Sequence, residues 1–532
     1  MSARPPARRP SIPHPSLPVM ALACWLTGLT LALPTTAHAQ IVIDLDGVVP
    51  AGDETHFFVP FEVPPGIVEI EVSHMALSPD NILDFGLEDA DGFRGWGGGN
   101  AEPAVVGVDR ASRSYVPGPI AAGTWRVVVG KAKLVELPAL YQLRVTLRTA
   151  AEATLPAQPE RAPYVDPGAL ATGRRYYAGD FHVHSRESGD AHPTLDEIAT
   201  VARANGLDFV VITDHNTHTG LDYMNAAQAR HPDLLFVPGV EFTTYAGHAN
   251  GIGATRWVDH RVGVEGATIA DAVAAYDEQG ALFSINHPAL SLGNLCIGCA
   301  WNHPIDDSAV DAVEIMTGAT SIARTAFLGA SLAFWDGFCA RGRHVAALGG
   351  SDDHRAGEGT GTLDSPIGSP TTMVEADELS VAAILEGVRQ GRTVVRITGS
   401  AAPMVTLTAR EGLVGDTATA GRAHLVVRID GGLGGAFHVV RNGVTPEEPL
   451  PIDADPFTYE LEAPAPDEGE DRYRVEVLEG GKTVTITSYV YVRRPVGGGG
   501  CASAPGGTGG AALVWAGLLL AVGLARGRRR AR

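Results

Sequence analysis

The chain has 532 residues, of which 45% are hydrophobic, so it is too long for one ordinary domain and apolar enough for several cores. Its formal net charge is -21 without a basic stripe, so we expect no nucleic-acid partner. The 64 glycines and 36 prolines follow no strict period, which excludes a collagen-like protein.

Residues 1–39 have the pattern of a secretory signal peptide. Three arginines in the first nine residues precede the apolar run Val19–Leu33 and an Ala37-His38-Ala39 cleavage site. The apolar run is short for a membrane span, so we expect cleavage before Gln40 and export of the remaining chain. A permanent membrane anchor is the alternative.

Residues 496–532 combine a Gly-rich linker with Cys501, the short apolar run Ala511–Ala525 and a cluster of five arginines. This order resembles the MYXO-CTERM class of C-terminal sorting tags. The resemblance implies processing near Cys501 and delivery to the cell surface or secretion. The alternative is a tail that stays in the membrane as a single span, with its arginines on the cytoplasmic side.

Two segments alternate apolar and polar residues in short runs, which is typical of β-sandwiches. The first, residues 40–150, is similar to the pre-peptidase C-terminal type of accessory domain, and an Ala/Pro-rich linker follows at 151–169. The second, residues 401–495, predicts an immunoglobulin-like sandwich. We therefore expect a multidomain protein in which two all-β domains flank a central α/β domain.

Residues 170–400 alternate short apolar runs with helical patterns at Leu195–Asn205, Ile269–Gln279 and Val381–Gln390, which favours parallel α/β architecture. Twelve of the 18 histidines fall between positions 182 and 354, many directly after an apolar run. An α/β barrel builds its active site at that end of its strands. Because residues i and i+2 share one face of a strand, His182 and His184 can face one metal ion.

Further polar residues follow later strands in the same way. They occur in Asp214-His215-Asn216, at Glu241, in Gly247-His248-Ala249-Asn250, at His287-Pro288 and in Asp352-Asp353-His354. Packing does not need polar side chains at these positions, and burying them without partners would be costly. Metal coordination would supply the partners.

In order, H-x-H-S, T-D-H, G-V-E, N-H-P and S-D-x-H resemble the PHP (polymerase and histidinol phosphatase) superfamily over about 230 residues. G-V-E-F-T-T followed by G-H-A-N is most similar to its carbaryl-hydrolase-like (CehA/McbA) metallohydrolase branch. The resemblance implies a distorted (β/α)7 barrel with two or three divalent ions. The mixed nitrogen and oxygen ligands suit Zn, Mn or Fe.

Carried over residue by residue, the resemblance implies three ligand sets. His182, His184, Glu241 and Asp352 would hold one ion. Glu241 would bridge to a second ion with His287 and His248, and the third ion would fall to Asp190, His215 and His354. Asp190 matches the usual S-D-G element only in part, because the sequence reads Gly189-Asp190-Ala191.

The implied function is hydrolysis of a small-molecule substrate by a metal-activated hydroxide, on a phosphoester or related ester. Amide or carbamate hydrolysis is the alternative, and a non-catalytic surface protein that binds metal or glycan is a further one. Asp352 or His354 would move the proton, and Arg355 would meet an anionic substrate. Amidohydrolases also begin with H-x-H, but many bridge two metals with a carboxylated lysine, and residues 160–400 contain no lysine.

Cys296 and Cys299 form a lone C-x-x-C pair, for which we expect a local disulfide in an oxidising compartment. A zinc site there would need two more ligands, and His303 is the nearby candidate.

Overall fold

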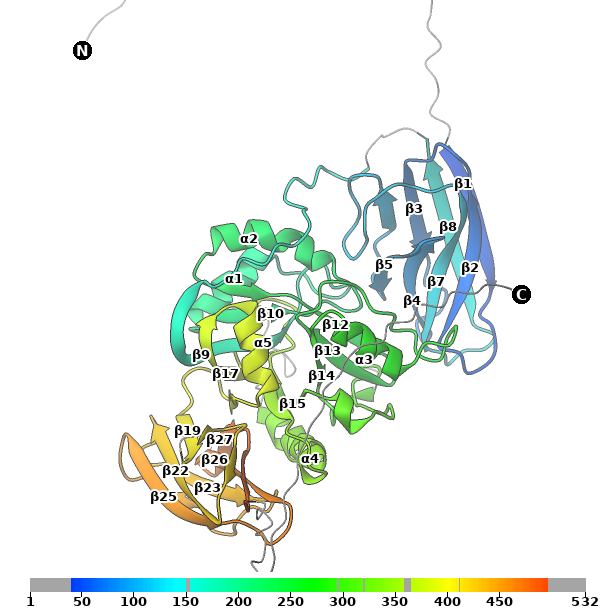
Figure 1. The fold of residues 1–532 in the computed structure, drawn as a ribbon. Coiled ribbons are helices and arrows are strands. Elements are labelled where there is room, and N and C mark those ends of the chain that lie inside the picture. Colours follow the sequence, from blue (N-terminus) through cyan, green and yellow to red (C-terminus); the bar gives the residue numbers. More distant parts are fainter. Residues whose placement is uncertain are drawn as a thin grey trace, which may run out of the picture. The chain divides into compact units, whose positions relative to one another are not determined.

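The computed structural model describes residues 40–149, 154–293, 296–318, 321–357, 365–410 and 412–495 (Figure 1). The chain divides between residues 161 and 162 into two compact units. The expected signal peptide and sorting tail lie outside the described residues. Within the described part of the chain, no helix is long and apolar enough to cross a membrane.

The first unit consists of two four-stranded antiparallel sheets around one hydrophobic core, which is the layering of a β-sandwich. Inward residues such as Ile70, Trp125 and Val145 alternate along the strands with exposed ones, as expected for strands buried on one face. One sheet has the order β1(Gln40–Val48), β8(Leu140–Arg148), β3(Glu69–His74), β6(Ala104–Gly107); the other has β2(His56–Val63), β7(Gly123–Lys133), β4(Ile82–Asp89), β5(Gly92–Gly98).

The second unit begins with α/β structure. Its strands are β9(Ala171–Val183), β10(Phe209–Ile212), β11(Leu235–Val237), β12(Gly239–Thr244), β13(Gly247–Ile252), β14(Leu282–Ile285), β15(Ala312–Thr317), β16(Ala346–Gly350), β17(Thr371–Leu379) and β18(Thr393–Arg396). Its α-helices are α1(Leu195–Ala204), α2(Met224–Arg230), α3(Ile269–Asp277), α4(Ser321–Ala340) and α5(Val381–Arg389), and 3-10 turns span Thr219–Tyr223 and Asp307–Ala309. The three predicted helices are confirmed as α1, α3 and α5, while the sequence patterns had not indicated α4.

Local sequence explains these helices. Thr194 and Glu197 form a capping box at the start of α1, and Leu195, Ile198, Ala199 and Ala202 bury one face at helical spacing. Thr268 and Asp271 cap α3 in the same way. These helices pack beside the strands that carry the histidines.

The α/β strands form two sheets rather than one continuous ring. Strands β11, β10, β9, β17 and β18 belong to one sheet, and β12 to β16 form the other. Isolated parallel bridges, His215 with Glu241 and Val183 with Asp353, join the sheets where the strands end. Strands β12 and β13 pair antiparallel, unlike the strands of a regular β/α barrel. A closed, distorted (β/α)7 barrel therefore stays a prediction.

The second unit continues without a break into the C-terminal strands, because β18 pairs with β27(Lys482–Thr487). The larger sheet continues through β26(Glu470–Glu479), β23(Ala436–Arg441) and β24(Leu450–Pro451), with β28(Val490–Arg493) and β21(Thr417–Thr419) beside it. A second sheet, β20(Gly412–Leu413), β19(Met404–Ala409), β22(Arg422–Asp430) and β25(Phe457–Pro464), shares a core with these strands.

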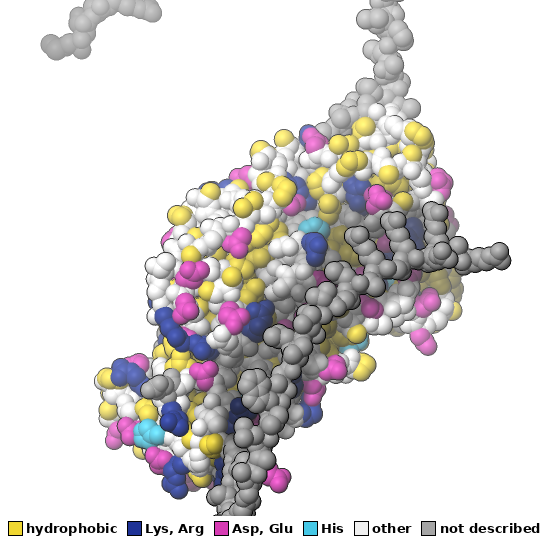
Figure 2. Space-filling model, viewed as in Figure 1, with side chains coloured by type: hydrophobic (Ala, Val, Ile, Leu, Met, Phe, Trp, Pro, Cys, Tyr) yellow, Lys and Arg dark blue, Asp and Glu magenta, His cyan; other side chains and the backbone are white. Residues whose placement is uncertain are grey.

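Buried polar contacts fix α4 against the C-terminal strands. Arg474 donates to Asp336 at 2.6 Å and pairs with Glu476, and Tyr489 also contacts both Arg474 and Asp336. Trp335 is fully buried, stacks on Tyr489 and donates to the carbonyl of Val345, so it packs α4 against these strands. On the face shown in Figure 2, acidic and basic side chains are interspersed over the described surface.

Candidate metal centre

Three carboxylates bring together the six histidines predicted at the strand ends. Glu241 on β12 lies at the centre and is fully buried. Its Oε1 lies 3.3 Å from His182 Nε2, 3.3 Å from His248 Nδ1 and 3.4 Å from His287 Nε2. Its Oε2 lies 2.6 Å from His215 Nδ1 and 3.7 Å from His184 Nε2. One carboxylate therefore faces five imidazoles.

Asp352 follows β16 and faces the H-x-H pair at the end of β9. Its Oδ1 lies 3.3 Å from His182 Nε2 and 3.1 Å from His184 Nε2, and 3.8 Å from His354 Nδ1. The i and i+2 histidines thus converge on the same carboxylates, as the strand periodicity predicts.

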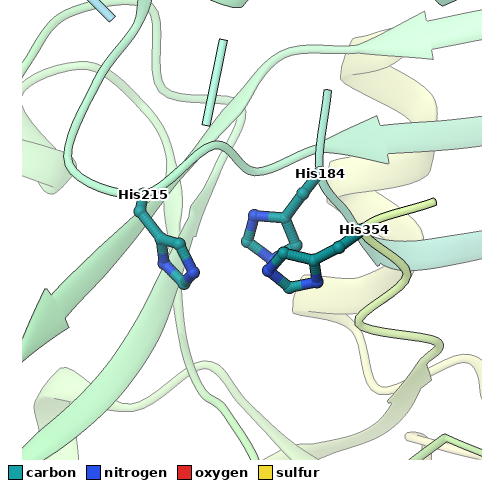
Figure 3. Close-up of side chains that lie close together, drawn as sticks. All are labelled: His184, His215 and His354. Carbon is teal, nitrogen blue, oxygen red and sulfur yellow. The ribbon is translucent and has the colours of Figure 1, made fainter. Parts of the chain in front are cut away.

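Asp190 completes the third group. Its Oδ2 lies 3.4 Å from the Nε2 atoms of both His215 and His354. Figure 3 shows the rings of His184, His215 and His354 approaching one another from three separate segments, with the His184 and His354 ring centroids 4.0 Å apart. One nitrogen of each of these three rings lies within 4.8 Å of the other two.

The second nitrogen of most rings has its own partner, which fixes the ring orientation. His287 Nδ1 donates to the carbonyl of Cys299 at 3.0 Å, His354 Nδ1 lies 2.9 Å from the carbonyl of Asp352, and His215 Nδ1 also lies 2.7 Å from Thr243 Oγ1. His184 Nδ1 lies 3.3 Å from Ser188 Oγ.

The backbone is strained at the same place. His287 has a φ of 28° and Asp352 a φ of 57°, values that residues other than glycine rarely adopt. Such strain occurs where function requires a particular geometry, and here it aims both side chains at the cluster.

Burial and mutual charge perturb these groups strongly. Burial opposes a charged His182, but Asp352 and Glu241 outweigh it and raise its pKa well above the usual value. Burial and the neighbouring His354 and His215 lower the pKa of His184 to about 3. Burial likewise opposes ionisation of Glu241, yet His182 and His215 hold its pKa well below the usual range.

The nitrogen and oxygen atoms of this cluster do not satisfy one another by hydrogen bonds, which suits a site that binds metal ions. His182 Nε2, His248 Nε2 and Glu241 Oε2 are buried atoms without a hydrogen bond of acceptable geometry among the described residues. His215 Nδ1 is close to Glu241 Oε2, but the angles do not form a hydrogen bond. Unsatisfied buried polar atoms are costly, and imidazole and carboxylate donors suit Zn, Mn or Fe. Two or three ions can be held by the groups around Glu241, Asp352 and Asp190.

Two functional residues were not predicted from the sequence. Glu314 on β15 lies 3.4 Å from His182 Nδ1 through Oε1, and Asn286 Nδ2 donates to Glu241 Oε1 at 2.9 Å. A single acidic residue inside the buried run Ala312-Val313-Glu314-Ile315-Met316 was the available signal.

Further polar residues lie near the cluster in other roles. Asp180 accepts from the backbone N–H groups of His182, Ser351 and Gly368, and Asp214 accepts from Ser185, so both hold loops rather than imidazole rings. Asn216 bonds the backbone of Thr243 on β12. Arg355 is exposed, and its backbone N–H donates to Asp353; its predicted role toward an anion stays a prediction.

Cys296 and Cys299 pair as a disulfide, as expected. His303 is engaged elsewhere, because its Nε2 lies 2.6 Å from Thr244 Oγ1. The disulfide uses both sulfur atoms of the alternative zinc site, and Cys299 Sγ lies within 4.8 Å of a ring nitrogen of His248 and of His287 instead.

No family model and no curated protein matches the sequence. Among solved structures, a two-domain protein from Bacteroides vulgatus that contains a predicted PHP-like metal-dependent phosphoesterase is 17% identical, with 62% of this chain and 98% of that chain covered and a TM-score of 0.35. An amidohydrolase from Chromobacterium violaceum with bound sulfate and no metal is 19% identical (35% and 93% covered, TM-score 0.24).

A proposed metal-dependent phosphoesterase from Bifidobacterium adolescentis is 16% identical (39% and 96% covered, TM-score 0.24). All three TM-scores lie below 0.5, so the function proposed below rests on the geometry of the site.

Proposed function

We propose that the protein is an exported, multinuclear metal-dependent hydrolase of the PHP type, acting on a phosphoester or related ester. The observation that supports this most directly is Glu241, a fully buried carboxylate whose two oxygens face five histidines. A packed core would not gather so many titratable groups around one carboxylate without a ligand to bind.

In this proposal, His182, His184, Glu241 and Asp352 hold one ion, Glu241 with His248 and His287 holds the second, and Asp190, His215 and His354 hold the third. Divalent ions bound there would ionise water near neutral pH and neutralise charge that develops on the substrate. Asn286 fixes Glu241 by donating to Oε1, and Asn250 accepts a second bond from the same Asn286 amide.

His354 and Asp352 are the proposed proton-transfer groups, because both lie at the more open side of the cluster, where substrate can enter. Their side chains are 24% and 21% exposed, whereas His182, His184 and Glu241 are at most 1% exposed. Arg355 follows directly and would meet the anionic group of a small-molecule substrate. The flanking β domains would attach or position the enzyme, and processing of the C-terminal tail near Cys501 would deliver it to the cell surface.

Metal content tests the proposal. Elemental analysis of the purified protein should give two or three equivalents of Zn, Mn or Fe, and Glu241→Ala/His287→Ala should lose them. His424→Ala is the matched control, because that exposed histidine pairs with Glu460 and Glu462, which lie outside the cluster. If the wild type holds less than about half an equivalent of metal and added metal does not restore it, the hydrolase proposal fails. The alternative of a binding or scaffold protein would then be favoured.

The rates of hydrolysis of different model substrates then identify the substrate class. A chromogenic phosphodiester and phosphomonoester should be hydrolysed faster than an aryl carbamate or anilide. The reverse order would favour the amide and carbamate alternative, which the G-V-E-F-T-T and G-H-A-N segments favour by resemblance.

A further inference from the structure

Glu314 contacts two of the proposed metal ligands at once. Its Oε2 accepts the backbone N–H of His287 at 2.9 Å, and its Oε1 lies 3.4 Å from His182 Nδ1. The side chain is 3% exposed, so water does not compete for either oxygen. The two ligands belong to different strands, β9 and the end of β14, and Glu314 joins them.

Two features of strands β15 and β16 allow Glu314 to reach His182. The register between β15 and β16 shifts between Glu314 and Met316, an irregularity of the kind that re-aims a side chain. Gly350 on β16 leaves the space, because a Cβ there would lie 2.4 Å from His182 Cβ and 2.6 Å from Glu314 Oε1. Any larger residue at 350 would separate the two side chains.

We propose that Glu314 is a positioning residue that fixes the tautomer of His182, an inference that rests on the proposed metal centre. A carboxylate accepts hydrogen bonds, so Glu314 favours a proton on Nδ1 and leaves Nε2 available once an ion takes the place of a proton there. The lone pair of Nε2 then faces Glu241 Oε1 and Asp352 Oδ1, each 3.3 Å away, where an ion would bind.

Glu314→Gln reverses this arrangement while keeping the size of the side chain. The His287 N–H needs an acceptor, so the glutamine oxygen must stay on that side. The amide NH2 then points at His182 Nδ1 and donates to it, which moves the imidazole proton to Nε2. A protonated Nε2 cannot bind a metal ion.

The ranking of two variants separates this role from simple packing. Glu314→Gln should weaken binding of Zn²⁺ by about 10- to 100-fold, the range for residues that orient a metal ligand. Glu314→Ala leaves either tautomer available, so it should weaken Zn²⁺ binding less, although it lowers the melting temperature more by leaving buried groups unpaired. Glu375→Gln is the control, a buried glutamate whose partners are Arg174 and Arg392.

Ring ¹⁵N chemical shifts of His182 in the metal-free protein, recorded above its pKa, provide a readout independent of metal. Because Glu241 and Asp352 also favour a proton on Nε2 in the metal-free protein, the expected result is a shift: Glu314→Gln should move the ring proton from Nδ1 toward Nε2 relative to the wild type. An unchanged tautomer, or a greater loss of Zn²⁺ affinity in Glu314→Ala than in Glu314→Gln, would overturn the inference. If the wild type binds no metal, the proposed function fails, and the ring shifts still decide the role of Glu314.

Discussion

His215 and Glu241 form an isolated parallel bridge between the two sheets of the α/β region, and the same two residues bring His215 Nδ1 within 2.6 Å of Glu241 Oε2. The backbone bridge and the side-chain contact involve the same two residues, so the imidazole and the carboxylate meet at one of the points where the sheets join. The joint between the two sheets is therefore part of the candidate metal centre.

Glu241→Gln should weaken the affinity for metal by more than about 100-fold, which exceeds the effect expected for a residue that only orients a metal ligand. The amide keeps the shape but removes the charge that faces five histidines. Calorimetric titration with Zn²⁺ or Mn²⁺ measures the change. Glu462→Gln, an exposed partner of His424, should bind like the wild type. Equal binding by both variants would argue against a metal centre at Glu241.

Metal loading should release protons at pH 7. Burial alone would lower the pKa of His354, but Asp190 raises it to about 9, so this imidazole is protonated in the metal-free protein at neutral pH. The bound proton stabilises the metal-free fold fully below pH 6.5, and this stabilisation is lost as the pH rises through about 9.

A metal ion must displace that proton, so metal affinity rises with pH in the same window. Binding enthalpies measured in buffers of different ionisation enthalpy report the number of protons released. A value of zero at pH 7, together with normal metal binding, would show that His354 is not a protonated ligand.

Asp190→Ala should remove one equivalent of metal and leave the others. Asp190 contacts only His215 and His354 within the cluster, and its side chain is 59% exposed, so its loss leaves little buried surface unfilled. His215 and His354 keep partners in Thr243 and the Asp352 carbonyl. Elemental analysis combined with a melting curve tests this, and loss of every ion would show that the three groups fill as one unit.

Trp335→Ala should lower the free energy of unfolding by about 3–5 kcal/mol, the cost of removing a large buried aromatic side chain. The indole is fully buried, stacks on Tyr489 and donates to Val345. Denaturant unfolding measures the loss. The metal content of the folded variant should stay unchanged, because Tyr489, Arg474 and Val345, which contact the indole, are not proposed metal ligands.

The sequence alone indicated most of the residues that gather around Glu241, because strand periodicity is a local property. His182 and His184 had to share one face, and apolar runs placed His287 and Asp352 after strands, whereas Glu241, expected at a strand end, lies inside β12. The capping boxes of α1 and α3 are equally local, and both helices lie where the pattern indicates.

Only the tertiary structure decided which atoms meet. Glu314 lies inside an apolar strand, and its contact with His182 depends on a register shift in β15 and on the missing Cβ of Gly350, which belong to different strands. The pairing of β18 with β27, which continues the sheet beyond residue 400, likewise joins residues about 90 positions apart. Such contacts depend on how distant strands twist and pack, and no local pattern encodes that geometry.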